Sequence, residues 1–407
     1  MRALPLDDGL QNMITRIGFL NFRSHAETSL ELQPMSLFIG PVAAGKSNAF
    51  KGMVLLQNSV HRSLIELFPP GLGEFHWVRS RWAGETDPIG FDVELEGLFG
   101  FPDDRARYSL KIADSPAGLY VVEETLQRKT GDQPWQWVFQ RRNRRRTMGE
   151  YGDVDPYEPT ILYRVWRQDG RVNRASPGPL FAKEVARNLS SFGYYHLEVS
   201  ALKALGTGQN RDRIGYYGEW LPDFIAWIKS EAENAGVYAS LLTEMRDILP
   251  ELDEILVTQV KSEEQGIAMS FRGHRGYISA LDLSDGTLFT LGMLCMMRGS
   301  RRPAVLCIEE PETGLHPRRL RWLFDHLMAL AYPAEGETPT QVFLSTHSPY
   351  LVDFFGEMQE CVQVFEQSEG RTRVSPLTRL QEEGLHLTPE PDEPIGRLWA
   401  TGLYESL

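Results

Sequence analysis

The sequence predicts an α/β fold, in which a mixed, largely parallel sheet is accompanied by an antiparallel β lobe and an inserted helical lobe. Three observations support this prediction. A glycine-rich segment at residues 40–47 stands between an apolar strand and a helical pattern. Continuous apolar runs alternate with helical patterns after residue 303, as in doubly wound sheets. Between them, short segments alternate apolar and polar residues, which is typical of antiparallel sheets with one solvated face.

The composition is typical of a globular protein from a reducing compartment. Of 407 residues, 42% are hydrophobic and 24% are charged, which is enough to build a sizeable core. Cys295, Cys307 and Cys361 lie far apart, and this spacing disfavours a disulfide framework or a metal knuckle. Residues 1–11 lack the apolar region of a signal peptide, and no apolar run is long enough to cross a bilayer. We therefore expect a cytoplasmic location.

The charge distribution gives a mixed indication about nucleic acid. A net charge of −13 disfavours a general nucleic-acid coat. Residues 141–146 nevertheless contain five arginines, directly after an aromatic strand at 135–139. This segment is either a basic hairpin tip that contacts phosphates or a solvated loop.

Hydrophobic periodicity predicts the elements in chain order. Strands are expected at 14–22, where Gly18 indicates a bulge, and at 28–32 and 35–39, and a helix at 47–58. Residues 68–88 are rich in Gly and Pro and are expected to be loop. Alternating segments predict a meander of strands at 91–96, 108–112, 119–126, 135–139 and 161–166. Apolar stripes predict helices at 180–190, 220–232 and 237–249.

The last part of the chain has the pattern of a parallel α/β sheet. A hairpin at 254–259 and 266–271 precedes a helix that begins at 283–287. Buried strands at 304–308 and 341–345 are followed by helices at 317–330 and 349–355. Short strands and loops are expected at 362–388, and a closing segment at 395–403. We predict one split domain, with a nucleotide-binding core at 1–100 and 281–407 and an inserted β-meander and helical lobe at 101–280.

Residues 40–47 fit the spacing G-x-x-x-x-G-K-[ST] in the strand–loop–helix setting that this pattern requires. Glycines let backbone N–H groups turn inward around a phosphate, and the helix start adds further N–H groups. Lys46 would hold the β- and γ-phosphates, and the Ser47 hydroxyl would ligate Mg²⁺. An ordinary glycine turn before a helix is the structural alternative. The residues expected to bind the nucleotide here are Gly40, Pro41, Ala44, Gly45, Lys46, Ser47 and Asn48.

Two further motifs place polar residues at the ends of predicted elements, a serine and a glycine at a helix start and two carboxylates at a strand end. Ser284 and Gly286, within Leu-Ser-Asp-Gly-Thr, open a helix and form either a second anion-binding end or a common cap and turn. Glu309 and Glu310 follow the strand at 304–308, at the end where open α/β sheets bind ligands. Glu309 would ligate Mg²⁺ through water, and Glu310 would orient or deprotonate the attacking water. The alternative is a solvated pair of strand-end carboxylates.

A histidine ends the next buried strand. His347 lies in Ser-Thr-His-Ser-Pro at 345–349, directly after the strand at 341–345. It would contact a γ-phosphate from the same sheet edge as the carboxylates. A lone histidine is more often a structural residue, so both interpretations are open at this point.

The order of these motifs resembles that of a known family. The phosphate loop, LSDGT, IEEPETGLHP and STHSP are together similar to the ABC-type ATPases of the SMC/RecF/OLD group. Within that group the chain resembles the stand-alone bacterial AAA family ATPases, which have neither coiled-coil arms nor a Toprim nuclease domain. The segments at 17–23 and 191–205 are also similar, whereas residues 103–187 hardly match.

The resemblance implies a P-loop ABC-type head that binds ATP with Mg²⁺ in a head-to-tail homodimer, with two ATP molecules between the subunits. Ser284 and Gly286 would reach the γ-phosphate bound by the partner subunit. Glu310 would be the catalytic base and His347 the switch histidine. Arg23 matches a basic residue near the nucleotide. Two departures, Val-Ala-Ala at 42–44 and a glutamate at 309, are compatible with slow hydrolysis.

The expected function is ATP-gated control of a nucleic-acid process, either DNA repair or anti-phage defence. The sixty residues after His347 are too few for a nuclease domain, so we expect a separate effector such as a nuclease, with DNA as a further partner. Two alternatives remain open. One is a nucleotide-bound scaffold that recruits a toxin or effector with little turnover. The other is the nucleotide-binding subunit of a membrane transporter, which the large inserted lobe disfavours.

Overall fold

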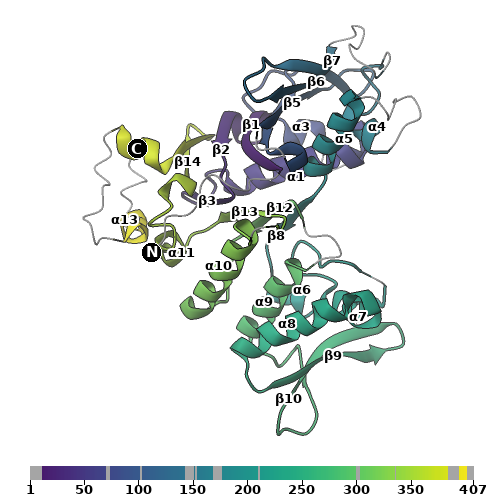
Figure 1. The fold of residues 1–407 in the computed structure, drawn as a ribbon, viewed down its shortest axis with the longest axis vertical. Helices are drawn as coiled ribbons and strands as arrows, with labels where there is room; N and C mark the ends of the chain where they lie inside the picture. The colour runs from purple at the N-terminus through teal and green to yellow at the C-terminus, as the bar shows by residue number, and fades with distance from the viewer. Residues whose placement is uncertain are drawn as a thin grey trace. The chain divides into compact units, whose positions relative to one another are not determined.

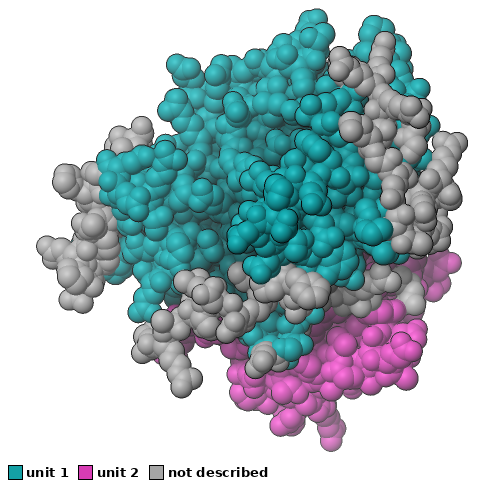
Figure 2. Space-filling model, turned by 45° about the horizontal axis from the view of Figure 1, so that its top comes forward, with its two compact units in different colours: residues 1–192, 329–407 teal, residues 193–328 magenta. Residues whose placement is uncertain are grey.

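The chain forms two compact units in a computed structural model (Figures 1 and 2). One unit comprises Met1–Phe192 and Ala329–Leu407, and the other comprises Gly193–Met328. We call them unit 1 and unit 2. The structure describes residues 12–69, 74–100, 103–142, 151, 154–167, 177–209, 211–298, 303–334, 336–383 and 394–400. The domain bounds predicted from sequence stay a prediction.

Unit 1 contains an antiparallel sheet that includes most of the predicted meander. Its strands follow the order β2-β1-β4-β5-β6-β7. Their bounds are β1 Met13–Phe22, β2 His25–Glu31, β4 Ile89–Glu96, β5 Asp104–Ala113, β6 Tyr120–Thr130 and β7 Gln136–Arg142. Alternate side chains of β5 are buried, as the sequence pattern predicts. The bulge expected at Gly18 is wrong, because the register of β1 and β4 shifts between Ile14 and Arg16 instead.

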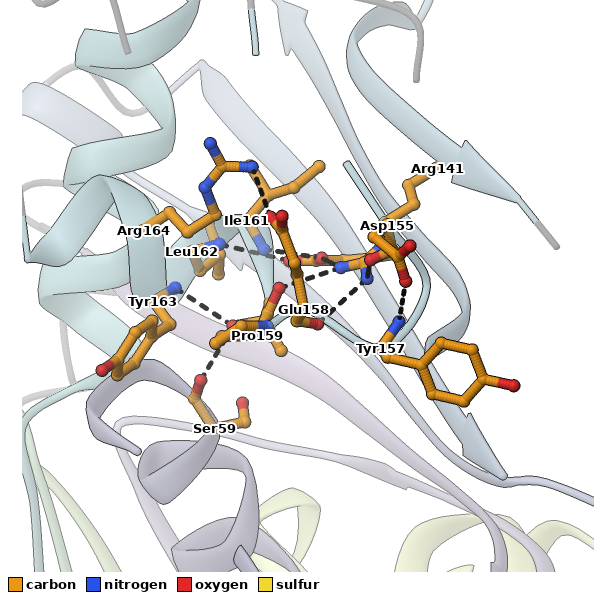
Figure 3. A network of polar contacts seen from close by, with 12 residues as sticks. Ser59, Arg141, Asp155, Tyr157, Glu158, Pro159, Ile161, Leu162, Tyr163 and Arg164 are labelled. Carbon is orange, nitrogen blue, oxygen red and sulfur yellow. Dashed lines mark hydrogen bonds and ion pairs between the residues drawn. The ribbon is translucent and has the colours of Figure 1, made fainter. Parts of the chain in front are cut away.

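The strand predicted at 161–166 is wrong, because these residues form the helix α4, Ile161–Trp166. Tertiary contacts decide the conformation at this point. The hydroxyl of Thr160 accepts a hydrogen bond from the Tyr163 N–H at 3.0 Å. The buried carboxylate of Glu124 accepts from the first helical N–H groups, at 2.7 Å for Ile161 and 3.2 Å for Leu162 (Figure 3). A carboxylate at the positive end of a short helix stabilises it against the strand preference of its side chains.

The basic hairpin tip is contradicted at its first two arginines. Arg141 is only 2% exposed, and its guanidinium lies 3.6 Å from the Glu124 carboxylate. It also donates to the carbonyls of Glu158 at 3.0 Å and Pro159 at 2.9 Å (Figure 3). Arg142 forms an ion pair with Glu123 at 2.7 Å. Arg141 is therefore a buried structural residue, whereas Arg142 is an exposed residue at the end of β7, and residues 143–150 lie outside the described residues.

Unit 1 also contains the strand that precedes the phosphate loop. The strand β3, Met35–Ile39, is buried throughout and pairs in parallel with both β13, Gln341–Ser345, and β14, Val362–Ser368. The strand β15, Arg371–Pro376, adds to β14 in the antiparallel sense. Phe38 packs against Phe50 and Phe365, with ring centroids 5.1 Å apart in both pairs. The strands expected at 35–39 and 341–345 are therefore neighbours in one sheet, although they lie about three hundred residues apart in the sequence.

The helices of unit 1 pack beside these strands. The helix α1, Lys46–His61, follows the phosphate loop, and the carbonyl of its Ser59 accepts from the buried hydroxyl of Thr160 at 2.8 Å (Figure 3). The segment at 68–88, expected to be loop, contains a short helix, and another helix lies in the segment at 362–388. The other helices are α2 Leu64–Leu67, α3 Phe75–Val78, α5 Pro177–Leu189, α11 Pro349–Asp353, α12 Leu377–Glu382 and α13 Ile395–Ala400.

Unit 2 contains the predicted helices and hairpin of the middle of the chain. The helices are α6 Val199–Leu202, α7 Leu221–Ser230, α8 Ala235–Ile248, α9 Asp285–Met296 and most of α10, Pro317–Ala331, whose last three residues belong to unit 1. The strands β9 Leu252–Lys261, β10 Glu264–Phe271 and β11 Ile278–Ser279 form an antiparallel sheet. The strand β12, Val305–Glu309, is fully buried beside β8, Phe192–Tyr195. Among the described residues, no helix is long and apolar enough to cross a membrane.

Candidate nucleotide-binding site

The phosphate loop has a backbone that only small residues allow. Gly40 and Gly45 have φ angles of 143° and 108°, a region that disfavours side chains. A Cβ at Gly40 would lie 2.1 Å from the carbonyl oxygen of Phe365, and one at Gly45 would lie 2.1 Å from the Thr372 hydroxyl. Gly45 is the N-cap residue of α1. The two glycines that the motif requires are therefore required here by space as well as by conformation.

The Lys46 side chain folds back into the loop. It is 6% exposed, and its ammonium donates to the carbonyls of Gly40 at 2.7 Å and Pro41 at 3.0 Å. A buried ammonium is stable only with such acceptors, and phosphate oxygens form stronger, charge-assisted hydrogen bonds with it. The lysine is therefore positioned at the loop, with weaker partners that an anion would replace.

Hydroxyl and amide groups hold the outside of the loop. Thr372, on β15, lies 2.8 Å from the carbonyl of Ala44, to which it donates, and 2.8 Å from the Ser24 hydroxyl. The amide of Asn48 donates to the same Ser24 hydroxyl at 2.8 Å. The loop is therefore fixed by residues from the β1–β2 turn, from α1 and from β15.

A buried histidine supports the loop from the other side. His25 Nε2 lies 3.1 Å from the carbonyl of Gly45, and its Nδ1 lies 2.8 Å from the Thr28 hydroxyl. Burial lowers the pKa of His25 to about 4, so the ring is neutral at physiological pH. Because a carbonyl only accepts, the ring proton is assigned to Nε2.

His347 and Arg23 lie near this loop within unit 1. Ser345 is the register partner of Phe38, and the Thr346 N–H donates to the Phe38 carbonyl at 3.2 Å. β3 and β13 run in parallel, so His347 follows β13 at the same end of the sheet at which Gly40 follows β3. Arg23 precedes Ser24 in the β1–β2 turn and has a positive φ of 51°. Unit 1 brings together the loop residues, Asn48, Arg23 and His347.

Unit 2 carries the remaining predicted site residues. Ser284 is the exposed N-cap residue of α9, and its hydroxyl accepts from the Thr287 N–H at 3.3 Å. A Cβ at Gly286 would lie 3.0 Å from the Arg319 guanidinium and 3.1 Å from the carbonyl of Gly314. The start of α9 therefore packs closely against the turn before α10, with the Ser284 side chain at the surface.

The two carboxylates at the end of β12 have very different surroundings. Glu309 is 7% exposed, and its Oε1 accepts hydrogen bonds from the hydroxyls of Tyr194 and, at 3.2 Å, of Tyr216. Burial first, and then the neighbouring charge of Glu309, raises the pKa of Tyr194, and burial raises that of Tyr216, so both stay protonated donors. Glu310 is half-buried and has a φ of 46°, in the left-handed region. Such strain in a non-glycine residue is frequent at functional sites.

Sequence reasoning missed several residues that hold these groups. Ser24 and His25 lie between the two predicted strands and belong to none of the motifs. Tyr194 and Tyr216 precede Glu309 by about a hundred residues, and Thr372 follows the loop by more than three hundred. Only sheet pairing and loop packing bring them to their partners, so no local spacing could have identified them. The functional roles assigned to the predicted site residues stay predictions.

Comparisons with known proteins agree with the fold and the motifs. Residues 215–353 match a family model described as an AAA domain, putative AbiEii toxin, Type IV TA system. A solved Smc head bound to the C-winged helix domain of ScpA is similar with a TM-score of 0.50 at 10% identity, over 89% of this chain and 97% of that chain. A Smc head with an extended coiled coil, bound to the C-terminal domain of ScpA from Pyrococcus furiosus, has a TM-score of 0.46 at 9% identity, over 92% and 98%. No curated protein sequence matches the chain.

The fold class predicted from the sequence is confirmed. The mixed α/β fold is similar to that of the solved Smc head bound to the C-winged helix domain of ScpA. The family match covers residues 215–353, a range that contains the motifs at 283–287, 309–310 and 345–349.

Proposed function

We propose that this chain binds ATP with Mg²⁺ at residues 40–47 and hydrolyses the ATP within a head-to-tail homodimer. The observation that carries the proposal is the buried Lys46 ammonium, held at the carbonyls of Gly40 and Pro41 inside a loop with left-handed glycines. An ordinary glycine turn would have no need to bury a lysine in this way, because burying an ammonium is unfavourable.

The residues of the chain divide the work of hydrolysis in this proposal. Lys46 exchanges its carbonyl partners for phosphate oxygens, and loop N–H groups bind the same phosphates. Ser47 and, through water, Glu309 would hold Mg²⁺, and oxygen donors of this kind suit that ion. The bound ion would neutralise the charge that develops on the phosphates. Glu310 orients or deprotonates the attacking water, and His347 contacts the γ-phosphate.

Dimerisation would complete each site with Ser284 and Gly286 of a second copy. The exposure of Ser284 at the start of α9, a helix of 12 residues, supports this part of the proposal. A helix N-terminus offers N–H groups and a positive dipole end to a phosphate. The Ser284 hydroxyl, at the surface, is accessible to a nucleotide held by another subunit.

Nucleotide binding by Lys46→Ala tests the site. We expect the affinity for a fluorescent ATP analogue to fall by about 100-fold, because charged hydrogen bonds to the phosphates are lost. Lys51→Ala is the matched control, since Lys51 is an exposed residue of the same helix. Equal affinity of Lys46→Ala and the unaltered chain would refute the site assignment.

We further propose that ATP controls a nucleic-acid process, DNA repair or anti-phage defence, through a separate effector in the cytoplasm. The description of the matching family as a putative toxin of a Type IV TA system favours a defence role. The similar Smc head is bound to a domain of ScpA, which favours a protein partner for this chain also. ATP turnover with and without double-stranded DNA, single-stranded DNA and RNA tests this, together with identification of co-purifying proteins.

A second candidate is a nucleotide-bound scaffold that recruits a toxin or effector and hardly turns ATP over. The same family description favours it, and so does Val-Ala-Ala at 42–44, which departs from the phosphate loop of the family that the sequence resembles. The two candidates differ in turnover. If Glu310→Gln lowers the steady-state ATPase rate by orders of magnitude, the scaffold is rejected; if the unaltered chain is as slow as Glu310→Gln, the scaffold is preferred.

A further inference from the structure

We propose that Tyr194 and Tyr216 are positioning residues for Glu309: their hydroxyls fix one carboxylate oxygen and thereby set how strongly the nucleotide site holds Mg²⁺. The inference rests on the proposed function, because it assigns Glu309 to the Mg²⁺ ligands. It concerns two residues that no motif includes.

The three side chains form a closed triangle of hydrogen bonds within unit 2. Tyr194 donates to Glu309 Oε1, Tyr216 lies 3.2 Å from the same oxygen, and the two hydroxyls are 3.1 Å apart. A phenol has a single proton to donate. Tyr194 therefore gives its proton to Glu309, and Tyr216 shares its proton between Glu309 and Tyr194. A carboxylate oxygen with two donors cannot rotate without breaking both bonds.

Both tyrosines are themselves held by the surrounding backbone. Tyr194 lies on β8, next to β12 in the sheet. The carbonyl of Tyr216 accepts from the His196 N–H at 2.9 Å, and that of Tyr217 accepts from the Glu198 N–H at 2.8 Å. The Tyr216 ring packs between Tyr194 and Tyr217, with centroids 4.5 Å and 4.4 Å away. The hydroxyls are thus preorganised, as groups that orient metal ligands are.

The arrangement also gives a reason for a glutamate at this position. An aspartate at 309 would be one methylene shorter and would draw the carboxylate away from the two hydroxyls. The buried Glu309 carboxylate needs hydrogen-bond donors, and hydrogen bonds to an ionised group are the stronger kind. The two tyrosine hydroxyls therefore fit a glutamate at position 309 and not an aspartate.

Two neighbouring tyrosines provide matched controls. Tyr195 follows Tyr194 on β8, so its side chain points to the opposite face of the sheet. Tyr217 packs against Tyr216 and is 40% exposed. Replacing either by phenylalanine removes a hydroxyl close to the site but leaves both hydrogen bonds to Glu309 Oε1 in place.

The test measures binding of a fluorescent non-hydrolysable ATP analogue to the full chain, in EDTA and over a Mg²⁺ titration. For Tyr194→Phe, Tyr216→Phe and the double variant, we expect the affinity in EDTA to equal that of the unaltered chain. The Mg²⁺ concentration that gives half of the metal-dependent gain should rise by about 10- to 100-fold in the double variant, as for other residues that orient metal ligands. Tyr195→Phe and Tyr217→Phe should titrate like the unaltered chain.

Two results would overturn the inference. One is an unchanged Mg²⁺ titration in the double variant. The other is an equal loss of affinity in EDTA, which indicates a merely structural role. If the unaltered chain binds the analogue without any effect of Mg²⁺, the proposed function fails together with the inference. If Mg²⁺ strengthens binding of the analogue to the unaltered chain and to the tyrosine variants at the same concentrations, only the inference fails.

A double-mutant cycle keeps the question decidable even if the double tyrosine variant does not fold. Glu309→Asp should show the same rise in the Mg²⁺ requirement, because its carboxylate is withdrawn from the hydroxyls. Adding Tyr216→Phe to Glu309→Asp should then change the Mg²⁺ titration by less than about twofold, since residues in one network are not additive. Fully additive effects would show that Tyr216 does not act through Glu309.

Discussion

The phosphate loop of unit 1 and the carboxylate end of β12 in unit 2 are held in opposite ways. The loop depends on the absence of side chains, since a Cβ at Gly40 would lie 2.1 Å from a carbonyl oxygen. Glu309 depends on the presence of side chains, since two tyrosine hydroxyls fix its carboxylate. A backbone that binds phosphates must expose its N–H groups, whereas a carboxylate must be aimed.

This difference predicts which kinds of substitution each region tolerates. At the loop, an added methyl group is the most damaging change, because it meets backbone that cannot move. At β12, removal of a single oxygen atom changes the site while the packing of the ring stays the same.

Gly40→Ala should have the largest effect. Its positive φ and the close Phe365 carbonyl together should lower the free energy of unfolding by about 4 kcal/mol. Gly118→Ala is the matched control, because Gly118 also has a positive φ but nothing lies within 4 Å of its added Cβ. Strain alone should cost it about 1–2 kcal/mol. Denaturant unfolding measures both, and equal losses would show that the space at Gly40 is not what limits the loop.

The buried His25 should make stability depend on pH. Its pKa is about 4 when folded, against an ordinary value of 6.5, so only the unfolded chain takes up a proton between these values. The neutral His25 contributes about 3 kcal/mol to the free energy of unfolding above pH 6.5. This contribution is lost as the pH falls towards 4.

Unfolding of His25→Gln across this pH range measures the effect. The difference in unfolding free energy between the variant and the unaltered chain should shrink as the pH falls from 6.5 to 4, because glutamine does not titrate. A difference that is constant over the same window would contradict the neutral, buried histidine.

Thr372→Val should lower the free energy of unfolding by about 2 kcal/mol, since the carbonyl of Ala44 and the Ser24 hydroxyl each lose a partner at nearly unchanged side-chain volume. Thr372→Ser keeps the hydroxyl and is the control, with a smaller loss. Denaturant midpoints compare them. A serine variant that is less stable than the valine variant would indicate that packing, and not hydrogen bonding, holds this side of the loop.

Ser284→Ala should have the smallest effect on folding, about 1 kcal/mol, because it removes the N-cap hydrogen bond of α9. The rest of α9 is buried on nearly all sides, and this packing stays intact. Thermal unfolding of the free chain measures the loss. A loss of unfolding free energy as large as that of Gly40→Ala would mean that the main role of Ser284 is to stabilise unit 2 and not to contact a nucleotide.

The sequence predicted those elements whose patterns are local. The phosphate loop between β3 and α1, the buried strand β12 and the alternating strands β4 to β7 follow directly from periodicity and glycine spacing. The helix α4 does not, because Thr160 and the distant Glu124 decide its conformation. The arginine-rich sequence at 141–146 predicts a surface position for Arg141, yet its guanidinium is buried beside Glu124 and three backbone carbonyls.

For the candidate site, the motif residues were predictable and their supports were not. Lys46, Glu309 and His347 lie where their patterns placed them, at element ends. Tyr216 and Thr372 act through hydrogen bonds to residues far away in the chain, so they carry no signal that a single sequence reveals. Supporting residues of this kind can be recognised only when the fold is known, because their partners lie far away in the sequence.

In the proposed function, the phosphate loop is half of a site, and a second copy of the chain completes it. Light scattering of Glu310→Gln with Mg²⁺ and ATP tests it most directly, because this variant should bind ATP and hold it uncleaved. We expect the molar mass of Glu310→Gln to double when ATP is added. When Lys46→Ala or Ser284→Arg is combined with it, the molar mass should stay that of a monomer. An unchanged mass with ATP bound, or doubling that persists with Ser284→Arg, would contradict the claim.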